Sequence, residues 1–442
     1  MKITFIRPNL SDRRSADAME PLVFAILARL TPADIDITFY DERVEPLDLR
    51  DTPDLVALTV ETYTARRAYQ ISTSYKERGV PVVMGGYHPS LLPEEAAKFA
   101  DALIIGDAEE LWPQLIADFR KGNLQKVYRN ENPPAIENVL GDYSLFKGKR
   151  YGKIKPVYAG RGCKYACDFC SINAFYGNSV RQRPLNDVIA EVESFKSKLF
   201  FLIDDNLFVD LQRTTALLNA LIPLKIHWVC QTSIEIAQNK ELMDLLARSG
   251  CIAATIGFES LNRENLKQMN KASNLHQHDY TSTIQQFYDR GIMIYGTFVF
   301  GYDHDTRDSF EPVVDFAIES KFCLANFNPL LPTPGTRLYK RLESAGRLLY
   351  KQWWLDHNYR YGSATFKPAL MSPDDLTNGC FQARKDFNSY SSIFSRTFRL
   401  KANSGSVRNI ACCLIANFIN KKEVMVKQNS CLGAQYPLIS TE

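Results

Sequence analysis

The sequence lacks the features of a membrane-spanning, secreted or strongly nucleic-acid-binding protein. Its longest clearly apolar run, residues 410–419 (IACCLIANFI), is too short to cross a bilayer. The first residues, MKITFIRPNL, contain a short apolar run that Pro8 stops, so they predict a strand and not a secretory signal. The net charge is only +3, which gives no argument for a nucleic-acid partner. We therefore expect a cytoplasmic protein that does not act on nucleic acid.

Cysteine is the residue type with the most uneven distribution. The chain has ten cysteines and no expected secretory signal, which favours a reducing compartment over disulfide formation. Three of them, Cys163, Cys167 and Cys170, fall within eight residues, and no cysteine precedes them. In a reducing compartment such a cluster indicates metal ligands more than disulfide partners.

The chain is long enough for two or three domains. Its 442 residues exceed one ordinary core, and 45% hydrophobic with 23% charged residues is typical of globular proteins. The pattern of apolar runs changes along the sequence, at a polar stretch rich in Pro, Gly and Asn and again in the last hundred residues. We predict a doubly wound domain over 1–135, a linker over 136–153, a partial barrel over 154–340 and a mainly helical region over 341–442.

The first part predicts an α/β fold with a doubly wound, mostly parallel sheet. Short β-rich runs alternate with segments of helical apolar spacing, which is typical of such sheets. Ligands of these sheets lie beyond the carboxyl ends of the strands. The expected strands are 3–8, 35–42, 55–60, 80–86 and 102–106. The candidate ligand loops are therefore Pro8 to Ser11, Thr59 to Thr64, Gly85 to Pro89 and Gly106 to Glu110.

The third part predicts six further β/α units. Six units in sequence favour a full or partial barrel, with its active site at the carboxyl ends of the strands. The three clustered cysteines directly follow the first of these strands, so we expect them at that end. The expected strands are 155–160, 198–204, 225–231, 251–258, 292–301 and 324–331.

The last part contains an apolar run between basic residues, over 394–422. Two interpretations fit this pattern: a helix packed on the barrel, and an amphipathic helix at a membrane surface. A peripheral membrane contact through the C-terminal region therefore stays among the expected partners.

The spacing of the three cysteines favours an iron–sulfur cluster with one open iron. Intervals of four and three residues keep the thiols on one short loop, whereas four cysteines would be the closed arrangement. An open position leaves room for a substrate or cofactor, as in catalytic metal sites. Structural zinc is the alternative, but the next cysteine or histidine, His227, comes 57 residues after Cys170, and no second CxxC exists.

The segment CKYACDFC, with Phe169 before the last cysteine, resembles the CxxxCxxC signature of the radical SAM superfamily. The resemblance implies a [4Fe–4S] cluster whose open iron binds S-adenosylmethionine (SAM). One electron then cleaves SAM to a 5′-deoxyadenosyl radical, which abstracts hydrogen. The segments LIDDN and IGFESLNRENLKQMNK and the end of the third barrel strand also resemble the family. The implied SAM-binding residues are Asp204, Asp205, Asn206, Gln231, Ser233 and Glu259.

A doubly wound domain ahead of such a barrel resembles the cobalamin-binding class of the superfamily, over roughly residues 1–370. The segments DLVALTVETYTARRAYQI, VPVVMGGYHPSLLPEEA and ALIIGDAEELWPQL carry this resemblance. The sequence departs from the DxHxxG pattern of many cobalamin proteins, and His88 is the only histidine of the domain. The alternative is a domain that packs on the barrel without cobalamin. The implied cobalamin-binding residues are Thr59, Glu61, Gly85, Gly86, His88 and Gly106.

The resemblance implies a methylase that acts on a poorly activated carbon or phosphorus. Residues 328–342 (NPLLPTPGTRLYKRL) and 371–396 are similar to members that modify hopanoids and tetrapyrroles, which implies a bulky, apolar small-molecule substrate. A one-electron reductant such as ferredoxin or flavodoxin is implied as a partner. The alternatives are a radical SAM oxidoreductase or cyclase without cobalamin, and a non-enzymatic iron–sulfur sensor. A tRNA methylthiotransferase would carry cluster cysteines before Cys163, and this chain has none.

Overall fold

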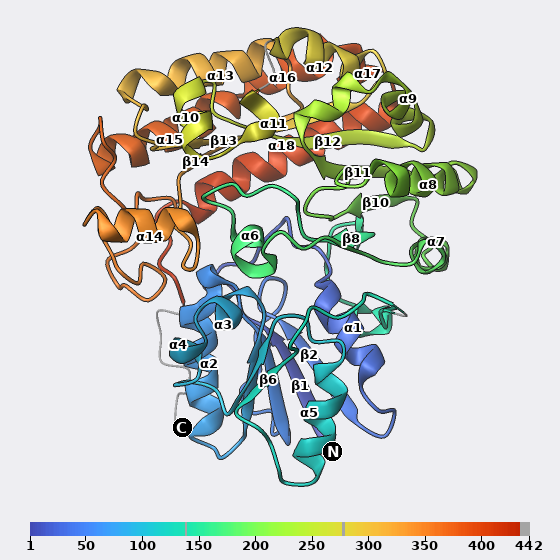
Figure 1. Ribbon diagram of the computed structural model, residues 1–442, viewed down its shortest axis with the longest axis vertical. Helices are drawn as coiled ribbons and strands as arrows, with labels where there is room; N and C mark the ends of the chain where they lie inside the picture. Colours follow the sequence, from blue (N-terminus) through green and yellow to red (C-terminus); the bar gives the residue numbers. More distant parts are fainter. Residues whose placement is uncertain (138, 276–278, 434–442) are drawn as a thin grey trace.

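The computed structural model describes residues 1–137, 139–275 and 279–433. Figure 1 shows an N-terminal α/β body (blue) below a larger α/β body that is covered by helices (yellow to red), with α6 (Ser171–Tyr176) between them. The expected mixture of a doubly wound sheet and a partial barrel is confirmed. Among the described residues, we find no helix that is both long and apolar enough to cross a membrane.

The N-terminal body contains a six-stranded parallel sheet with strand order β2-β1-β3-β4-β5-β6. The chain adds β2 on one side of β1 and then returns to place β3 on the other side, so the order reverses beside β1. A crevice opens at such a reversal, beyond the carboxyl ends of the strands. The strands are β1 (Lys2–Arg7), β2 (Asp36–Asp41), β3 (Leu55–Thr59), β4 (Val82–Gly85), β5 (Ala102–Ile105) and β6 (Val127–Arg129).

Helices cover both faces of this sheet because its strands are apolar on both sides. On one face Phe5 stacks on Phe24 of α1, with ring centroids 5.3 Å apart, and lies beside Trp112 of α5. On the other face Val56 and Leu58 pack with residues of α2. The helices are α1 (Leu22–Leu30), α2 (Ala65–Lys76), α3 (Tyr87–Leu91), α4 (Pro93–Ala96) and α5 (Leu111–Arg120), with a 3-10 turn η1 (Thr62–Thr64).

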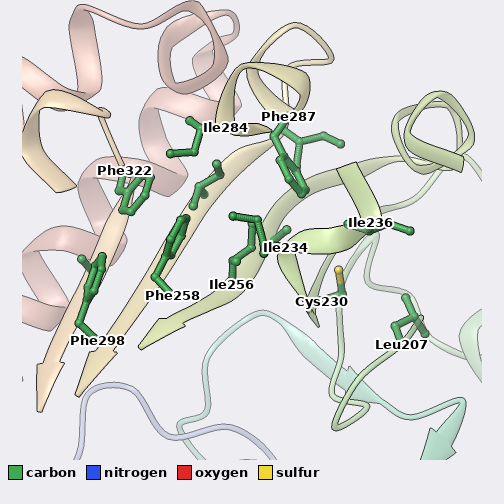
Figure 2. Packing of buried hydrophobic residues seen from close by; sticks show 14 of the residues in the cluster. Leu207, Cys230, Ile234, Ile236, Ile256, Phe258, Ile284, Phe287, Phe298 and Phe322 are labelled. Atoms are coloured by element: carbon green, nitrogen blue, oxygen red, sulfur yellow. The ribbon is translucent and has the colours of Figure 1, made fainter. Parts of the chain in front are cut away.

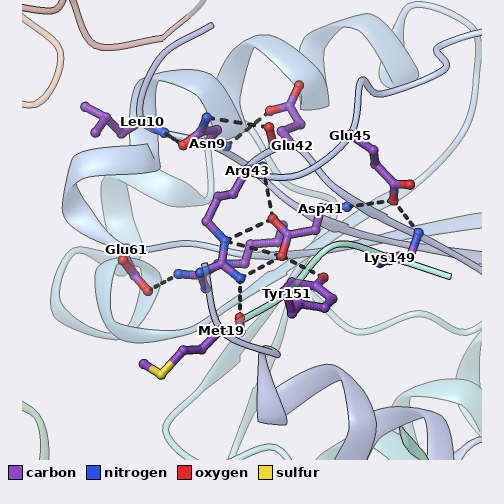
Figure 3. A network of polar contacts seen from close by, with 11 residues as sticks. Asn9, Leu10, Met19, Asp41, Glu42, Arg43, Glu45, Glu61, Lys149 and Tyr151 are labelled. Carbon is purple, nitrogen blue, oxygen red and sulfur yellow. Dashed lines mark hydrogen bonds and ion pairs between the residues drawn. The ribbon is translucent and has the colours of Figure 1, made fainter. Parts of the chain in front are cut away.

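Residues 136–153, the expected linker, are fixed to this sheet by polar contacts. Tyr151 donates a hydrogen bond to Asp41 at the end of β2 (2.9 Å), and Lys149 donates to the backbone oxygen of Phe39 (2.8 Å). Figure 3 shows Arg43 between the Asp41 carboxylate and the backbone oxygen of Met19. The segment contains the 3-10 turn η2 (Tyr143–Phe146). The domain boundaries themselves stay predictions.

The second body contains six parallel strands in the order β14-β13-β12-β11-β10-β7. Strands β7 and β14 are the two edges, so the barrel is open, as expected for a partial barrel. The strands are β7 (Lys155–Val157), β10 (Leu199–Leu202), β11 (His227–Thr232), β12 (Cys251–Glu259), β13 (Met293–Phe300) and β14 (Leu324–Pro329). A short antiparallel pair, β8 (Gly160–Arg161) and β9 (Arg181–Gln182), follows β7.

The outer face of the barrel is covered by helices that bury its largest apolar cluster. Phe258 of β12 lies between Phe298 of β13 and Phe322, with ring centroids 5.6 and 5.0 Å away, and Figure 2 shows Ile284 and Phe287 of α12 above them. The helices are α7 (Leu185–Ser194), α8 (Leu211–Leu221), α9 (Lys240–Arg248), α10 (Arg263–Gln268), α11 (Ala272–Leu275), α12 (Tyr280–Tyr288), α13 (Phe310–Glu319) and α14 (Arg337–Ser344), with 3-10 turns η3 (Ile222–Leu224), η4 (Ile234–Gln238) and η5 (Arg307–Ser309).

The C-terminal region is helical, as expected, and contacts both bodies. Cys412 and Cys413 of α18 pack against Val229 and Ala253, on the face of the barrel sheet opposite the main apolar cluster. Trp353 joins the apolar cluster of the N-terminal sheet. The helices are α15 (Pro373–Phe387), α16 (Tyr390–Phe398), α17 (Lys401–Ser404) and α18 (Val407–Lys427).

Candidate functional site

The three clustered cysteines lie on one loop at the carboxyl end of the barrel strands. The loop runs from β8 to α6, and Cys170 is the residue before the first turn of α6. Gly162 makes the turn that opens the loop: its φ is +91°, and a Cβ there would come 1.9 Å from the backbone oxygen of Ser179. Only glycine fits this position without a backbone shift, so the sequence fixes where the loop begins.

Without a nearby cation, the thiols of this loop do not readily lose their protons. Burial raises the pKa of the Cys167 thiol to about 11, and burial also raises the pKa of Cys170. Metal ions remove this penalty because a coordinating thiol is deprotonated. Among the described residues, no group of three His, Cys, Asp or Glu side chains is placed so that it could hold a single metal ion. The donors at hand are three thiols on one loop, and their chemistry fits an iron–sulfur cluster.

Two neighbouring carboxylates tie the end of β10 to the chain that leads into the cysteine loop. Asp204 accepts a hydrogen bond from the backbone nitrogen of Ala159 (3.0 Å), and Asp205 accepts one from that of Gly162 (2.8 Å). Burial raises the pKa of Asp204 to about 7. The side-chain nitrogen of Asn206 lies 4.0 Å from the Cys163 sulfur. All three expected residues of the LIDDN segment therefore adjoin the entry to the loop.

The ends of β11 and β12 complete the surroundings of the loop. Gln231 is the second-last residue of β11, and Ser233 directly follows this strand. Strand β11 lies between β10 and β12 in the sheet. Glu259 ends β12 with a φ of +62°, and its carboxylate lies 3.0 Å from the Lys271 ammonium. Gly257 leaves room for this pair, since a Cβ there would come 2.1 Å from the Glu259 oxygen.

Lys271 is a site residue that the sequence analysis did not single out. Its ammonium group opposes the rise in pKa of both Cys167 and Cys170, so its positive charge acts on the cysteine loop. It belongs to the same quoted segment as Glu259, IGFESLNRENLKQMNK, but nothing in that segment indicates that the lysine folds back onto the carboxylate. The contact depends on the turn between α10 and α11.

A large cavity lies between the carboxyl ends of the N-terminal sheet and the barrel. Its interior is about 370 Å³, within the usual range of about 300–1,000 Å³ for small-molecule sites. Thr59, Glu61, Gly85, Gly86 and Gly106 all line it, so five of the six expected cobalamin-binding residues share one wall. Gly86 has a φ of +106°, and a Cβ there would come 2.9 Å from the backbone oxygen of Val60.

His88, the sixth of these residues, is not among the residues that line the cavity. Its side chain is fully buried, and its Nε2 atom lies 3.0 Å from both the Tyr69 hydroxyl and the Glu95 carboxylate. Trp354 donates its indole N–H to the same carboxylate at 3.0 Å. The imidazole therefore takes part in a buried polar contact between the N-terminal domain and the C-terminal region.

The cavity has two parts of different chemistry. A deep part between the sheet and helices α1 and α5 is apolar, with Leu27, Ala57, Val83, Ile104 and Trp112 on its walls. The part towards the barrel is aromatic and charged, and apart from Asp205 the sequence analysis did not single out its residues, because they lie in short elements and connections without a periodic pattern. These residues are Tyr158, Gly160, Arg161, Phe175, Tyr176, Ile203 and Asp205. These residues would suit a cofactor with both apolar and polar portions, such as cobalamin.

The charged side of the cavity links the two bodies. Arg161 donates to Asp107, which follows β5, at 2.8 Å, and also pairs with Glu109 at 2.5 Å. Arg181 pairs with the other oxygen of Asp107 at 2.5 Å. Asp205 belongs both to this cavity and to the support of the cysteine loop. The two candidate cofactor sites are therefore adjacent and share a wall.

Comparisons with known proteins agree with this geometry. Residues 157–317 match the family described as the radical SAM superfamily, and residues 15–116 match the B12 binding domain. The chain is 31% identical to the bacteriochlorophyllide d C-12(1)-methyltransferase of Chlorobaculum tepidum over 85% of this chain and 84% of that protein. It is 24% identical to the hopanoid C-2 methylase of Rhodopseudomonas palustris, over 75% and 66% of the two chains.

The fold also matches a solved structure. The cobalamin-dependent SAM radical enzyme OxsB, solved with aqua-cobalamin and SAM bound, superposes with a TM-score of 0.65 at 14% identity. The match covers 96% of this chain and 72% of that chain. The arrangement of sheet, barrel and helices is thus shared over nearly the whole length.

Proposed function

The chain belongs to the cobalamin-binding methyltransferases of the radical SAM superfamily, and from this premise we propose that it methylates an unactivated carbon of a bulky, apolar substrate of the tetrapyrrole or hopanoid type. Its cofactors are a [4Fe–4S] cluster, SAM and cobalamin. When bound, the cluster delivers an electron that cleaves SAM, and cobalamin carries the methyl group. The observation that supports this proposal best is the position of the Asp205 side chain, which lines the large cavity and also supports the cysteine loop.

The cluster is held by Cys163, Cys167 and Cys170 in this proposal. Asp205 fixes the first turn of their loop through Gly162, and the Lys271 charge favours the thiolate forms. Three thiols would leave one iron open, and the polar residues at the ends of β10, β11 and β12 would be available to hold SAM there. The SAM contacts are Asp204, Asp205, Asn206, Gln231, Ser233 and Glu259.

Cobalamin occupies the large cavity in this proposal. Thr59, Glu61, Gly85, Gly86 and Gly106 form its sheet side, with glycines where the backbone must approach the ring closely. The apolar deep part excludes water from an aromatic arm. We leave His88 out of this site because its ring is engaged by Tyr69 and Glu95 away from the cavity.

The partners follow from the same chemistry. The electrons come from a small one-electron carrier of the ferredoxin or flavodoxin type. We infer a reducing, cytoplasmic compartment, which the ten cysteines of the sequence also led us to expect.

Anaerobic reconstitution tests the proposed function. The protein is loaded with iron, sulfide and hydroxocobalamin, then given SAM with a deuterated methyl group, a reductant and either a bacteriochlorophyllide or a hopanoid. We expect S-adenosylhomocysteine, 5′-deoxyadenosine and a substrate that gains the deuterated methyl group. Cys167→Ala should abolish all three products, whereas Cys412→Ala, on α18, should retain them. Formation of 5′-deoxyadenosine alone, with no corrin retained, would contradict the methylase and favour a cobalamin-independent radical enzyme.

A further inference from the structure

The long C-terminal helix α18 buries several polar side chains and exposes several apolar ones. The buried residues of this helix are Asn409, Cys413, Asn417 and Glu423. The outward side instead exposes Val407 (85%), Ile415 (59%), Phe418 (40%) and Met425 (55%), whose intervals of eight, three and seven residues place them on one side of the helix. A helix at a protein surface ordinarily shows the opposite arrangement, so this side is suited to an apolar environment.

Helix α16 has the same inversion. Its buried residues are Ser392, Arg396 and Thr397, together with one apolar residue, Ile393. Tyr390, Phe394 and Phe398 follow one another at intervals of four residues, so they lie on one face, and they are 60%, 47% and 53% exposed. Three aromatic side chains left in solvent on a single nine-residue helix are costly, because each could bury a large apolar area elsewhere.

The buried polar groups hold both helices in this orientation. Arg396 donates to the backbone oxygens of Phe322 and Cys323 (2.6 and 2.8 Å) and to the side-chain oxygen of Asn417 (2.9 Å). Asn417 in turn donates to the oxygen of Cys323 (2.8 Å). Turning either helix over would leave these groups unpaired in the interior. The outward apolar face is therefore a fixed property of the fold.

The two helices form one continuous surface. Tyr390 of α16 contacts Phe418 of α18, with ring centroids 6.3 Å apart, and Phe394 stacks on Phe398 at 6.2 Å. We call this surface the α16–α18 face; it consists of Tyr390, Phe394, Phe398, Val407, Ile415, Phe418 and Met425. Contiguous exposed apolar surface of this kind marks an interaction site.

The charge around the α16–α18 face is almost entirely positive. Residues 389–428 contain one acidic residue, Glu423, which is buried and paired with Lys427 at 2.9 Å. The Lys421 ammonium lies 4.6 Å from the centroid of the Tyr390 ring. The same segment contains the basic residues Arg396, Arg399, Lys401, Arg408, Lys421, Lys422 and Lys427. Of these, Arg399, Lys401, Arg408 and Lys422 are exposed.

We propose that the α16–α18 face docks on the surface of an anionic lipid bilayer. An aromatic and aliphatic centre surrounded by lysine and arginine is the pattern of helices that lie in the interface of such bilayers. A second copy of the same face would bring two positive rims together, which opposes self-association. This binding is independent of the methyl-transfer chemistry. It would also place the enzyme where an apolar substrate dissolves, a consequence that rests on the proposed function.

Tryptophan fluorescence and vesicle sedimentation test this proposal. The native tryptophans, Trp112, Trp228, Trp353 and Trp354, are buried, so Phe394→Trp adds a reporter on the α16–α18 face alone. We expect its emission to shift to shorter wavelength with vesicles of phosphatidylcholine and phosphatidylglycerol, and to stay unchanged with phosphatidylcholine alone. The full chain should sediment with the anionic vesicles only. Because no cofactor is needed for either readout, failure of the proposed enzymatic activity leaves this test intact.

Two sets of variants separate the apolar and the charged contributions. The triple variant Phe394→Ser, Ile415→Ser, Phe418→Ser should reduce vesicle binding at least about tenfold, since each lost side chain removes apolar area from the bilayer contact. Arg399→Gln with Lys422→Gln should reduce it about fivefold per residue at low salt and less at high salt. The matched control Val127→Ser with Leu211→Ser changes exposed apolar residues far from this face and should bind as the wild type does.

Three results would overturn the proposal. One is equal binding to neutral and anionic vesicles, and another is no binding to either. The third is a concentration-dependent dimer, seen by analytical ultracentrifugation, that the triple variant dissolves, because this would make a second copy the occupant of the face. All substituted side chains are exposed, so circular dichroism should show unchanged helix content in every variant.

Discussion

The carboxylate of Asp205 lies 2.8 Å from the backbone nitrogen of Gly162, the residue before the first clustered cysteine. The same side chain lines the cavity between the two bodies. One residue at the end of β10 thus contacts the support of the cluster loop and the wall of the proposed cobalamin site. A shift of the Asp205 side chain would therefore change both the support of the cysteine loop and the wall of the cavity.

Substitution of Asp205 should therefore affect the cluster. Asp205→Ala removes the acceptor for the Gly162 N–H, and we expect at least about a tenfold loss of cluster affinity, as is typical when a ligand-supporting contact is removed. Asp205→Asn keeps an acceptor and should retain most of the iron. Iron content and the visible absorbance of the reconstituted cluster provide the measurement. Equal iron content in Asp205→Ala and wild type would refute this role. The exposed Asp308→Ala serves as the control.

Gly162→Ala should lower the free energy of unfolding more than a glycine-to-alanine substitution whose only cost is the positive φ. Gly148 also has a positive φ (+82°), but a Cβ there would meet nothing within 4 Å, so Gly148→Ala should cost about 1–2 kcal/mol. At Gly162 the methyl group also overlaps the Ser179 oxygen, which adds about 1–3 kcal/mol. Chemical denaturation of the apoprotein measures both variants. Equal losses would mean that the Ser179 segment moves away freely.

The buried pair of Glu259 and Lys271 should show strong coupling. Lys271→Met leaves the Glu259 carboxylate buried without a partner, which costs about 3–5 kcal/mol. The double variant Glu259→Gln, Lys271→Met removes both charges and should cost clearly less than Lys271→Met alone. A double-mutant cycle on unfolding free energies measures the difference. Additive losses would show that the two charges do not interact in the folded state.

Stability should fall as the pH rises through the weakly acidic range. Burial raises the pKa of Asp305 to about 6 and that of Asp204 to about 7, from ordinary values near 4. The folded state holds these protons more tightly than the unfolded chain. The resulting stabilisation is complete below the unfolded pKa of about 4 and is lost as the pH rises through the folded values.

The variant Asp305→Asn measures this contribution. It cannot ionise but keeps an oxygen that can accept the backbone N–H of Gly301, which lies 2.8 Å from the carboxylate. We expect the slope of unfolding free energy against pH, between about 4 and 6, to become shallower than in the wild type. Asp375→Asn is the control, since hydrogen bonding to Ser372 lowers the pKa of that partly exposed carboxyl. An unchanged slope in Asp305→Asn would contradict the prediction.

Filling the deep part of the cavity should prevent cobalamin binding without loss of the cluster. Ala57 lies on its wall, and Ala57→Phe places a ring where the aromatic arm is proposed to lie. His88→Gln should retain cobalamin, because His88 is not among the residues that line the cavity. Corrin absorbance after gel filtration, per folded protein, measures both. Loss of corrin from His88→Gln with retention by Ala57→Phe would refute the site.

The pattern of the sequence predicted the regular elements better than the contacts between them. The five expected N-terminal strands and six barrel strands are present, because each contains an apolar run of strand length. Strand β6 was missed, since its three residues include two that are exposed. The β8–β9 pair was missed because each strand has two residues. Elements this short carry too few residues for a periodic signal.

The residues of the candidate site show the same difference: local sequence predicts some of them, and packing between distant segments places the others. The cysteine loop and the glycines beyond β4 and β5 follow from local sequence, because turns and strand ends specify them. Arg161, Phe175 and Lys271 reach the site only through packing between segments that are distant in sequence. His88 was expected in the cavity because it closely follows β4, but the helix α3 that begins at Tyr87 carries it to the opposite side. Such contacts are properties of the folded chain.

The packing of Trp353, Trp354 and Tyr359 into the apolar cluster of the N-terminal sheet determines when that sheet can be completed. Strands β1 to β5 leave the ribosome more than two hundred residues before these aromatic side chains do. One face of the sheet, including Tyr69 and Tyr75 of α2, therefore stays without part of its cover during most of synthesis. The N-terminal sheet therefore gains its full apolar cover only after the barrel has been synthesised.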